Sequence, residues 1–350
     1  MSKRPVGALA GIAMIFLLAA PAAGAMATRD VVIDEPSAAS ARISAASATG
    51  RYPVNDGSGA TIAVAVTLAC QESCAAADPQ RIADFVGTLI HGPEIELLTV
   101  QLDAPFQIEF DCGYGAQACY YPGENKIVLS GNDTPSDDGA SRDFVLAHEY
   151  GHHVANHRQS PAPFPAAIDW GTPRWSSQEH VCQSHRRGAL SPGDEELRYY
   201  ENPGEAFAEA FARYRFPESG ADWNWSKSLM PDRAAFEAIR KDTLEPWLGR
   251  ASLRLAGRPA SGPRADAARS FRSFRTPLDG TVSLQPSAEL ARRYRLSLWS
   301  TSGHVLRTAR DGLSLRSRLN FTVCGQSRLR VQLEAKHRSK PPFKLLIQRP

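Results

Sequence analysis

Four histidines and one glutamate lie within the twelve residues LAHEYGHHVANH, from position 146 to position 157. Three of these side chains form the pattern H-E-x-x-H, as His148, Glu149 and His152. A helix turns about 100° per residue, so two imidazoles four positions apart share one face and can bind one metal ion. Glu149 lies one step round the helix, where its carboxylate can contact a water on that ion. The spacing therefore predicts a catalytic zinc site.

A catalytic zinc ion usually has three protein ligands and one water. His153 points about 100° away from His152, and His157 lies on the wrong face if the helix continues. Glu205 fits better, because it lies in a second helical stretch, ENPGEAFAEAFARY, beside small alanines that leave room for an ion. We expect Glu205 to bind the metal and Glu209, one turn later, to hydrogen-bond a ligating histidine.

Other ligand patterns do not fit the sequence. The extended pattern with a third histidine requires Gly and His where this chain has Ala155 and Arg158, and an aspartate ligand within GTxxD would stand at Trp175. Glu205 has one alternative role. With Asn202 as the helix N-cap, it could close a capping box and satisfy only a backbone N–H.

H-E-Y-G-H, followed downstream by N-P-G-E-A-F-A-E-A-F-A, resembles the small gluzincin metalloproteases. The closest resemblance is to the catalytic domain of anthrax lethal factor and to the secreted Pro-Pro endopeptidases. It covers residues 61–248 and is specific at these two helices. The resemblance implies a zincin-like α+β catalytic domain, with His148, His152 and Glu205 as zinc ligands and Glu149 as general base.

The same families place a tyrosine upstream of the third ligand. The corresponding position here is Arg198, with Tyr199 and Tyr200 beside it. Either tyrosine is a candidate donor to the transition state, and an ordinary packed tyrosine is equally compatible with the sequence. The resemblance also implies that KIVLSG, at 126–131, is the edge strand that pairs with an extended substrate.

The elements that must position these residues can be predicted in outline. One helix begins at Asp78, which precedes a proline and apolar residues at helical spacing. A second begins at Asn202 and ends before Pro217, and a Pro-rich loop covers 159–198. Four stretches have the composition of strands: TIAVAVTLA, LLTVQL, FQIEFDC and KIVLSG.

The first 27 residues have a basic start, an apolar run and an A-x-A site, which predict a secretory signal peptide and no stable membrane span after cleavage. The six cysteines are an even number and suggest three disulfides, as expected outside the cell. Cys112 and Cys119 flank a Gly-rich turn and should pair. Cys70 could pair locally with Cys74, which would leave Cys182 with Cys324.

Charge and composition divide the 350 residues into parts. Residues 251–350 hold 20 of the 40 Lys/Arg but only 5 of the 37 Asp/Glu, and short alternating runs within them suggest a small β-sandwich that weakly resembles bacterial pre-peptidase C-terminal domains. Its arginines form either a solvated face or a site for an anionic wall polymer, a nucleic acid or an acidic protein. We expect these parts: a signal peptide at 1–27, a flexible leader or pro-segment at 28–59, a metallopeptidase domain at 60–250, a linker at 251–274 and an arginine-rich sandwich at 275–350.

These observations predict a secreted zinc-dependent endopeptidase acting on protein or peptide substrates. Glu149 and the zinc ion would activate a water that attacks the scissile carbonyl. The alternative is a secreted binding protein that acts through its basic C-terminal domain and carries a structural or degenerate zinc site. The presence of Glu149 favours the enzyme, because a purely structural site has no need of a general base.

Overall fold

A computed structural model provides the fold of the chain. The expected signal peptide, and the expected leader as far as residue 47, lie outside the residues that the structure describes. The described residues are 48–75, 77–132, 140–218, 222–257, 269–308, 318–325, 328–335 and 342–350.

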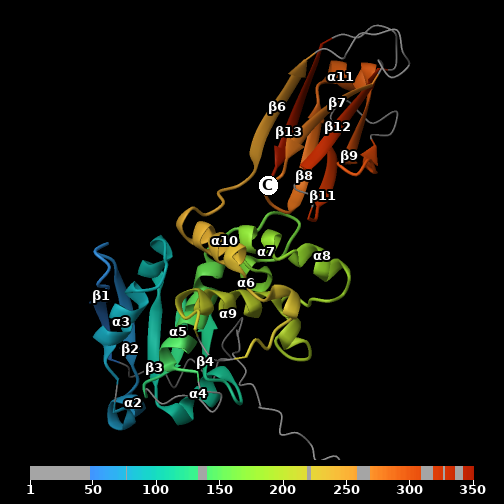
Figure 1. The fold of residues 1–350 in the computed structure, drawn as a ribbon. Coiled ribbons are helices and arrows are strands. Elements are labelled where there is room, and N and C mark those ends of the chain that lie inside the picture. The colour runs from blue at the N-terminus through green and yellow to red at the C-terminus, as the bar shows by residue number, and fades with distance from the viewer. Residues whose placement is uncertain are drawn as a thin grey trace, which may run out of the picture.

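The N-terminal part is built on a five-stranded mixed sheet with the strand order β1-β2-β3-β5-β4 (Figure 1). The three inner strands are parallel, and both edge strands run antiparallel to their neighbours. Inner strands covered on both faces tend to be apolar, which explains the run AVAV in β2 and the run IVL in β5, whereas β3 carries the buried polar residues Gln101 and Asp103. The strands are β1 (Ala48–Pro53), β2 (Thr61–Val66), β3 (Thr99–Asp103), β4 (Ala118–Tyr121) and β5 (Lys126–Ser130).

Helices pack against this sheet and continue beyond it to the C-terminal part (Figure 1). The two longest of them, α5 and α9, pack directly against each other. The helices are α2 (Leu68–Ser73), α3 (Pro79–Gly87), η1 (Pro93–Leu97), α4 (Pro105–Cys112), α5 (Arg142–Asn156), α6 (Ala167–Trp170), α7 (Pro173–Gln178), α8 (Val181–Arg186), η2 (Tyr199–Glu201), α9 (Pro203–Arg215), η3 (Lys227–Leu229) and α10 (Arg233–Leu244).

Several expected elements differ from the observed ones. FQIEFDC lies in helix α4 and is not a strand, because Ile108 and Cys112 are four residues apart and share one buried helical face. β1 occupies part of the expected leader, where it pairs with β2 along its whole length. KIVLSG was expected at the edge of the sheet, but its strand β5 lies between β3 and β4, and β4 forms the edge.

The C-terminal part contains two four-stranded antiparallel sheets, with the orders β10-β9-β12-β7 and β11-β8-β13-β6. Both contribute to one apolar core, which includes Leu298, Val331 and Ile347. Strand β6 and all but the last residue of β7 fall within the expected linker at 251–274, so the C-terminal sheets begin shortly after helix α10. The elements are β6 (Ala251–Gly257), β7 (Arg269–Arg275), β8 (Gly280–Pro286), α11 (Ala288–Arg293), β9 (Tyr294–Ser300), β10 (Val305–Thr308), β11 (Leu319–Val323), β12 (Arg328–Ala335) and β13 (Phe343–Arg349).

Covalent and backbone links join the two parts. The disulfide Cys182–Cys324 connects α8 to the sandwich, and Thr281 N donates to Ala162 O at 2.8 Å. The other bridges are Cys70–Cys74 and Cys112–Cys119, and no described cysteine is free. All three expected pairings are therefore confirmed. They agree with an oxidising environment.

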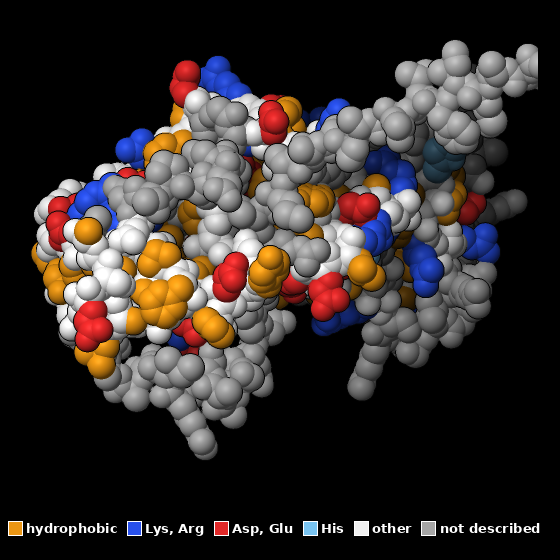
Figure 2. Space-filling model, turned by 90° about the horizontal axis from the view of Figure 1, so that it is seen from below, with side chains coloured by type: hydrophobic (Ala, Val, Ile, Leu, Met, Phe, Trp, Pro, Cys, Tyr) orange, Lys and Arg blue, Asp and Glu red, His pale blue; other side chains and the backbone are white. Residues whose placement is uncertain are grey.

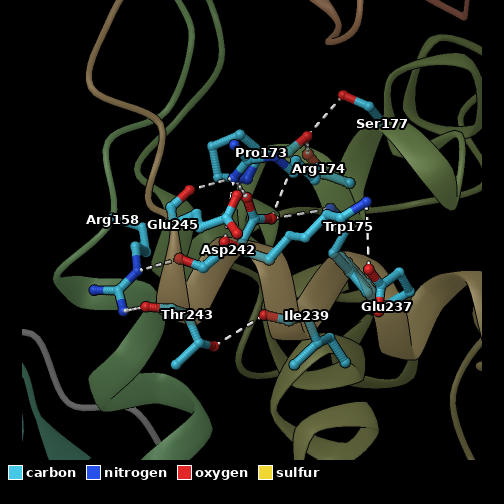
Figure 3. A network of polar contacts seen from close by, with 12 residues as sticks. Arg158, Pro173, Arg174, Trp175, Ser177, Glu237, Ile239, Asp242, Thr243 and Glu245 are labelled. Atoms are coloured by element: carbon cyan, nitrogen blue, oxygen red, sulfur yellow. Dashed lines mark hydrogen bonds and ion pairs between the residues drawn. The ribbon is translucent and has the colours of Figure 1, made fainter. Parts of the chain in front are cut away.

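A buried network around Asp242 fastens α10 to its neighbours (Figure 3). Its carboxylate accepts from the backbone N–H groups of Arg174 and Trp175, at 2.7 and 3.1 Å, and from the Arg174 guanidinium at 2.9 Å. Arg158, just after α5, donates to the backbone oxygens of Asp242 and Thr243 at 2.7 and 3.0 Å. The C-terminal end of α5 is thereby held against α10.

The end of the sheet opposite the sandwich exposes apolar side chains. Figure 2 views the molecule from this side and shows hydrophobic groups gathered over the end where α2 and α4 lie. The exposed large apolar residues of this region include Leu68, Phe106, Phe110 and Tyr114. Within the described ranges, no helix has the length and apolar character that crossing a bilayer requires.

Candidate metal centre

Helix α5 carries the H-E-x-x-H residues in the middle of the N-terminal part. Ser141 caps it by accepting from Phe144 N at 3.2 Å. A Cβ added to Gly151 would lie 2.8 Å from Ala208 Cα and 3.2 Å from Ala208 O. Glycine at this position therefore lets α5 approach α9 closely, which brings the histidines towards the second helix.

Helix α9 presents Glu205 from its first turn. Asn202 caps the helix by accepting from Gly204 N at 2.9 Å, while its own N–H donates to Tyr199 O. The Glu205 carboxylate therefore does not close the capping box and points to the histidines. A Cβ on Gly204 would lie 2.1 Å from Ile168 O, so glycine is needed where α9 meets α6.

The side chains of His148, His152 and Glu205 converge on one buried point. His148 Nε2 lies 3.3 Å from Glu205 Oε2, and His152 Nε2 lies 3.3 Å from Glu205 Oε1. The two Nε2 atoms are 3.2 Å apart. Ligands about 2.0–2.1 Å from a tetrahedral zinc ion are separated by about 3.3–3.4 Å. The spacing of the donors therefore matches that of zinc ligands.

The chemistry of the three donors also fits a cation. Two imidazole nitrogens that face each other at 3.2 Å repel through their lone pairs unless a proton or a cation lies between them. Burial opposes ionisation of Glu205, but His152 and His148 outweigh it and lower the pKa of that carboxyl to about 2. The site thus offers a buried carboxylate and two imidazoles to one positive charge.

Glu209 supports the first histidine from one turn further along α9. Its Oε2 lies 3.4 Å from His148 Nδ1, and its Oε1 accepts from Arg213 Nε at 2.8 Å. A carboxylate on the second ring nitrogen leaves Nε2 as the nitrogen with the free lone pair. Glu209 therefore lies behind His148, on the side of the ring away from Glu205.

The structure separates the two candidate tyrosines. Tyr199 is buried, and its hydroxyl donates to Glu205 Oε2 at 3.0 Å. Tyr200 is 41% exposed, with its ring against that of Tyr199. Glu149, the candidate base, is fully buried on α5 beside His148. Tyr199 is thus the tyrosine that reaches the centre.

Sequence analysis did not identify Trp225 as part of this site. Its ring centroid lies 6.0 Å from that of His148, 6.4 Å from that of Tyr199 and 5.6 Å from that of Trp223. Arg213 lies over the Trp223 ring at 5.5 Å. The sequence feature that could have indicated Trp225 is the pair of tryptophans in DWNWS. This stretch belongs to no regular helix or strand, so it shows no periodic pattern.

The remaining histidines of the opening motif have structural roles. His153 Nε2 lies 2.9 Å from Glu94 O and its Nδ1 lies 3.0 Å from Tyr120 Oη. Burial lowers the pKa of His153 to about 3, so the ring is neutral. His157 Nε2 lies 2.9 Å from Asn125 Oδ1. Neither histidine turns towards Glu205, as expected from the helix geometry.

Comparison with known proteins adds little. No protein-family model and no curated protein matches the chain. It is similar to the crystal structure of Legionella pneumophila aminopeptidase A in complex with aspartic acid, with 11% identity and a TM-score of 0.26, over 85% of this chain and 37% of that one. It is also similar to a family GH115 4-O-methyl-alpha-glucuronidase with specificity for decorated arabinogalactans, with 10% identity and a TM-score of 0.19, over 60% of this chain and 39% of that one. The chain spans less than half the length of either, so its function has to be argued from its own site.

Proposed function

We propose that the protein is a secreted zinc-dependent endopeptidase. The observation that carries the proposal is the convergence of His148, His152 and Glu205 at separations of 3.2–3.3 Å, with Glu149 buried beside them. A bound zinc ion in such a site lowers the pKa of a water and polarises a carbonyl oxygen. The zincin type follows from the H-E-x-x-H and downstream glutamate pattern.

The protein's own groups would then move the protons. Glu149 takes a proton from the attacking water and delivers it to the amine that leaves. Tyr199 would donate a hydrogen bond to the oxyanion by giving up its hydrogen bond to Glu205 Oε2 as charge develops on the substrate.

Secretion is proposed from the N-terminal sequence together with the three disulfides. Outside the cell the substrates would be proteins or peptides. The alternative function, a binding protein with a structural zinc site, accounts for the basic sandwich. It gives no reason for a buried glutamate beside two converging histidines.

A peptide-library digestion tests the proposal. The zinc-loaded protein should cleave peptides, a chelator should abolish cleavage, and added zinc should restore it. The matched variant is Glu149→Gln, which keeps the size of the side chain but cannot act as a base. We expect it to bind zinc normally and to lose at least about 100-fold in kcat, in line with general-base catalysis. Zinc binding without cleavage of any peptide by the unmodified protein would favour the binding-protein alternative.

A further inference from the structure

The sandwich carries a basic and aromatic surface on the outer side of the sheet β10-β9-β12-β7. Residues of β12 alternate between the core and this side, so Arg328 and Arg330 are exposed while their neighbours Leu329 and Val331 are buried. We call the surface formed by Phe271, Arg275, Trp299, Arg328 and Arg330 the basic aromatic face.

The three arginines of this face lie close to one another although their like charges repel. Arg275 lies directly opposite Arg328 in the β7–β12 register, and Arg330 is two residues further along the same strand. Like charges directly opposite on adjacent strands destabilise a sheet. Within the described residues no carboxylate pairs with these three side chains, and Glu334 lies further along β12, opposite Arg295. Folding alone gives no reason for such a cluster.

Two aromatic rings lie beside the arginines. Trp299 is directly opposite Arg330 in the β9–β12 register. Phe271, on β7, is 46% exposed, and its ring meets that of Trp299 edge to face across β12 with the centroids 6.0 Å apart. Phe271 is exposed and Trp299 is half-buried, and both lie on the side of the sheet that faces away from the core. They offer a rigid apolar platform next to the positive charges.

We propose that the basic aromatic face binds a linear polysaccharide that carries carboxylates, such as a polymer of uronic acids. The arginine guanidinium forms two parallel hydrogen bonds to a carboxylate, and the electron-rich ring faces attract the C–H groups of sugar rings. Both features lie on one sheet surface, where a chain of sugars can cross β7, β12 and β9 in sequence. The site would hold the protein on an acidic matrix.

This ligand fits the surface better than nucleic acid or an anionic membrane. The basic aromatic face contains three arginines, which is few for a phosphate backbone that binds mainly through charge. Arg275, Arg328 and Arg330 also lie on regular strands of a sheet. They are not on a protruding segment that could enter a bilayer. The proposal is independent of the zinc site.

Binding of the full-length protein to polygalacturonate tests the proposal. Affinity would be measured against polygalacturonate, neutral pullulan, single-stranded DNA and anionic phospholipid vesicles at the same salt concentration. The test variant replaces Arg275, Arg328 and Arg330 with Ser. The control variant removes the same charge elsewhere on the sandwich, as Arg254→Ser, Arg292→Ser and Lys344→Ser, all three of which are exposed.

We expect tight binding to polygalacturonate and none to pullulan. The test variant should bind at least about tenfold more weakly, and the control variant should stay within about threefold of the unmodified protein, since distant surface charges are screened. Phe271→Ser leaves the charge unchanged and should weaken binding about fivefold. Unchanged thermal unfolding temperatures would show that each variant is folded.

Three results would overturn the proposal. The first is no binding to polygalacturonate by the unmodified protein. The second is an equal loss in the test and control variants, or no loss with Phe271→Ser, since either would mean unspecific attraction by net charge. The third is tighter binding to DNA or to vesicles than to polygalacturonate with the same dependence on the three arginines.

Discussion

Two imidazole nitrogens 3.2 Å apart, each 3.3 Å from a carboxylate oxygen, define the centre of this molecule at the scale of single residues. The positions of His148, Glu149 and His152 could be predicted from sequence because four-residue spacing on a helix fixes a shared face. Glu205 could be predicted as well, because the site lacked a third ligand. The first prediction depends only on local helix geometry, whereas that of Glu205 depends on the number of ligands that zinc requires.

The choice between Tyr199 and Tyr200 could not be predicted in the same way. The two side chains lie in the short 3₁₀ turn η2, whose start and end no periodicity reveals. Trp225 lies outside regular structure, and its contact with His148 depends on how the chain returns to the site after α9. Contacts made by irregular segments are set by tertiary packing, which a single sequence does not display.

Exchanges of the two glutamates of α9 should differ in their effect on the metal. Glu205→Ala removes a proposed ligand, whereas Glu209→Ala removes the partner of His148 Nδ1 and of Arg213 but no proposed ligand. We expect Glu209→Ala to weaken zinc binding about 10–100-fold, as is typical for such partners, and Glu205→Ala to weaken it further. Competition with a chromophoric chelator measures both affinities. The reverse order would assign the ligand to Glu209.

At the scale of elements, secondary structure could be predicted best where a helical pattern of apolar residues extended over many positions. A helix was expected at the H-E-x-x-H motif, where α5 lies, and helix α9 was expected from Asn202 to before Pro217, close to its observed bounds. α4 was mistaken for a strand because apolar residues at positions two and four apart fit both periods over so short a stretch. β4 was missed because four buried residues give no alternation to detect.

The close contact of α5 and α9 makes a prediction about Gly151. Alanine normally stabilises a helix relative to glycine, but here its Cβ would lie 2.8 Å from Ala208 Cα. We expect Gly151→Ala to lower the free energy of unfolding by about 1–3 kcal/mol and to weaken zinc binding. Gly123→Ala is the control, because a Cβ there meets nothing within 4 Å. Denaturant unfolding measures the free energy of both variants. If Gly151→Ala is as stable as the unmodified protein or more stable, α5 and α9 do not pack as closely as described.

Glu179, between α7 and α8, should make the free energy of unfolding depend on pH. Burial, with Asp232 nearby, raises the pKa of Glu179 from 4.5 to about 7. Below pH 4.5 the Glu179 carboxyl is protonated in both the folded and the unfolded chain, so its contribution to the free energy of unfolding is fully present. As pH rises from 4.5 through 7 the unfolded chain releases the proton first, so stability is lost.

Glu179→Gln should remove this dependence. We expect the free energy of unfolding of the variant to exceed that of the unmodified protein by about 1–3 kcal/mol at pH 8, since one unit of pKa corresponds to about 1.4 kcal/mol. At pH 4.5 the two free energies should be equal. Urea unfolding at the two pH values measures the difference. Glu196→Gln, at an exposed position, should change neither value. An equal gain at both pH values would mean that ionisation of Glu179 is not the cause.

At the scale of the whole molecule, the division near residue 250 could be predicted from the step in charge. The start of the sandwich could not, because β6 and β7 lie in a stretch rich in Arg, Ala and Gly that resembles a linker. Their pairing with β13 and β12 involves residues far along the chain. Such long-range pairing is not visible in local composition.

Every residue assigned to chemistry precedes the sandwich, which predicts that the two parts are separable. A chain ending at Arg250, with Cys182→Ser to remove the unpaired thiol, should bind zinc and cleave a short peptide at a rate within about fivefold of the full chain. Peptide hydrolysis and zinc content measure this. The full-length Cys182→Ser, Cys324→Ser variant is the control for loss of the disulfide. If the shortened chain folds and binds zinc but does not cleave the peptide, the sandwich helps to form the active site.

The central claim is a metal ion held by His148, His152 and Glu205. Anomalous X-ray diffraction at the zinc absorption edge, on crystals of the zinc-loaded protein, tests it most directly. The account predicts one strong peak per chain, about 2.0–2.2 Å from His148 Nε2, His152 Nε2 and a carboxylate oxygen of Glu205. A fully loaded protein with no peak between these three side chains, or with its zinc at other residues, would contradict the account.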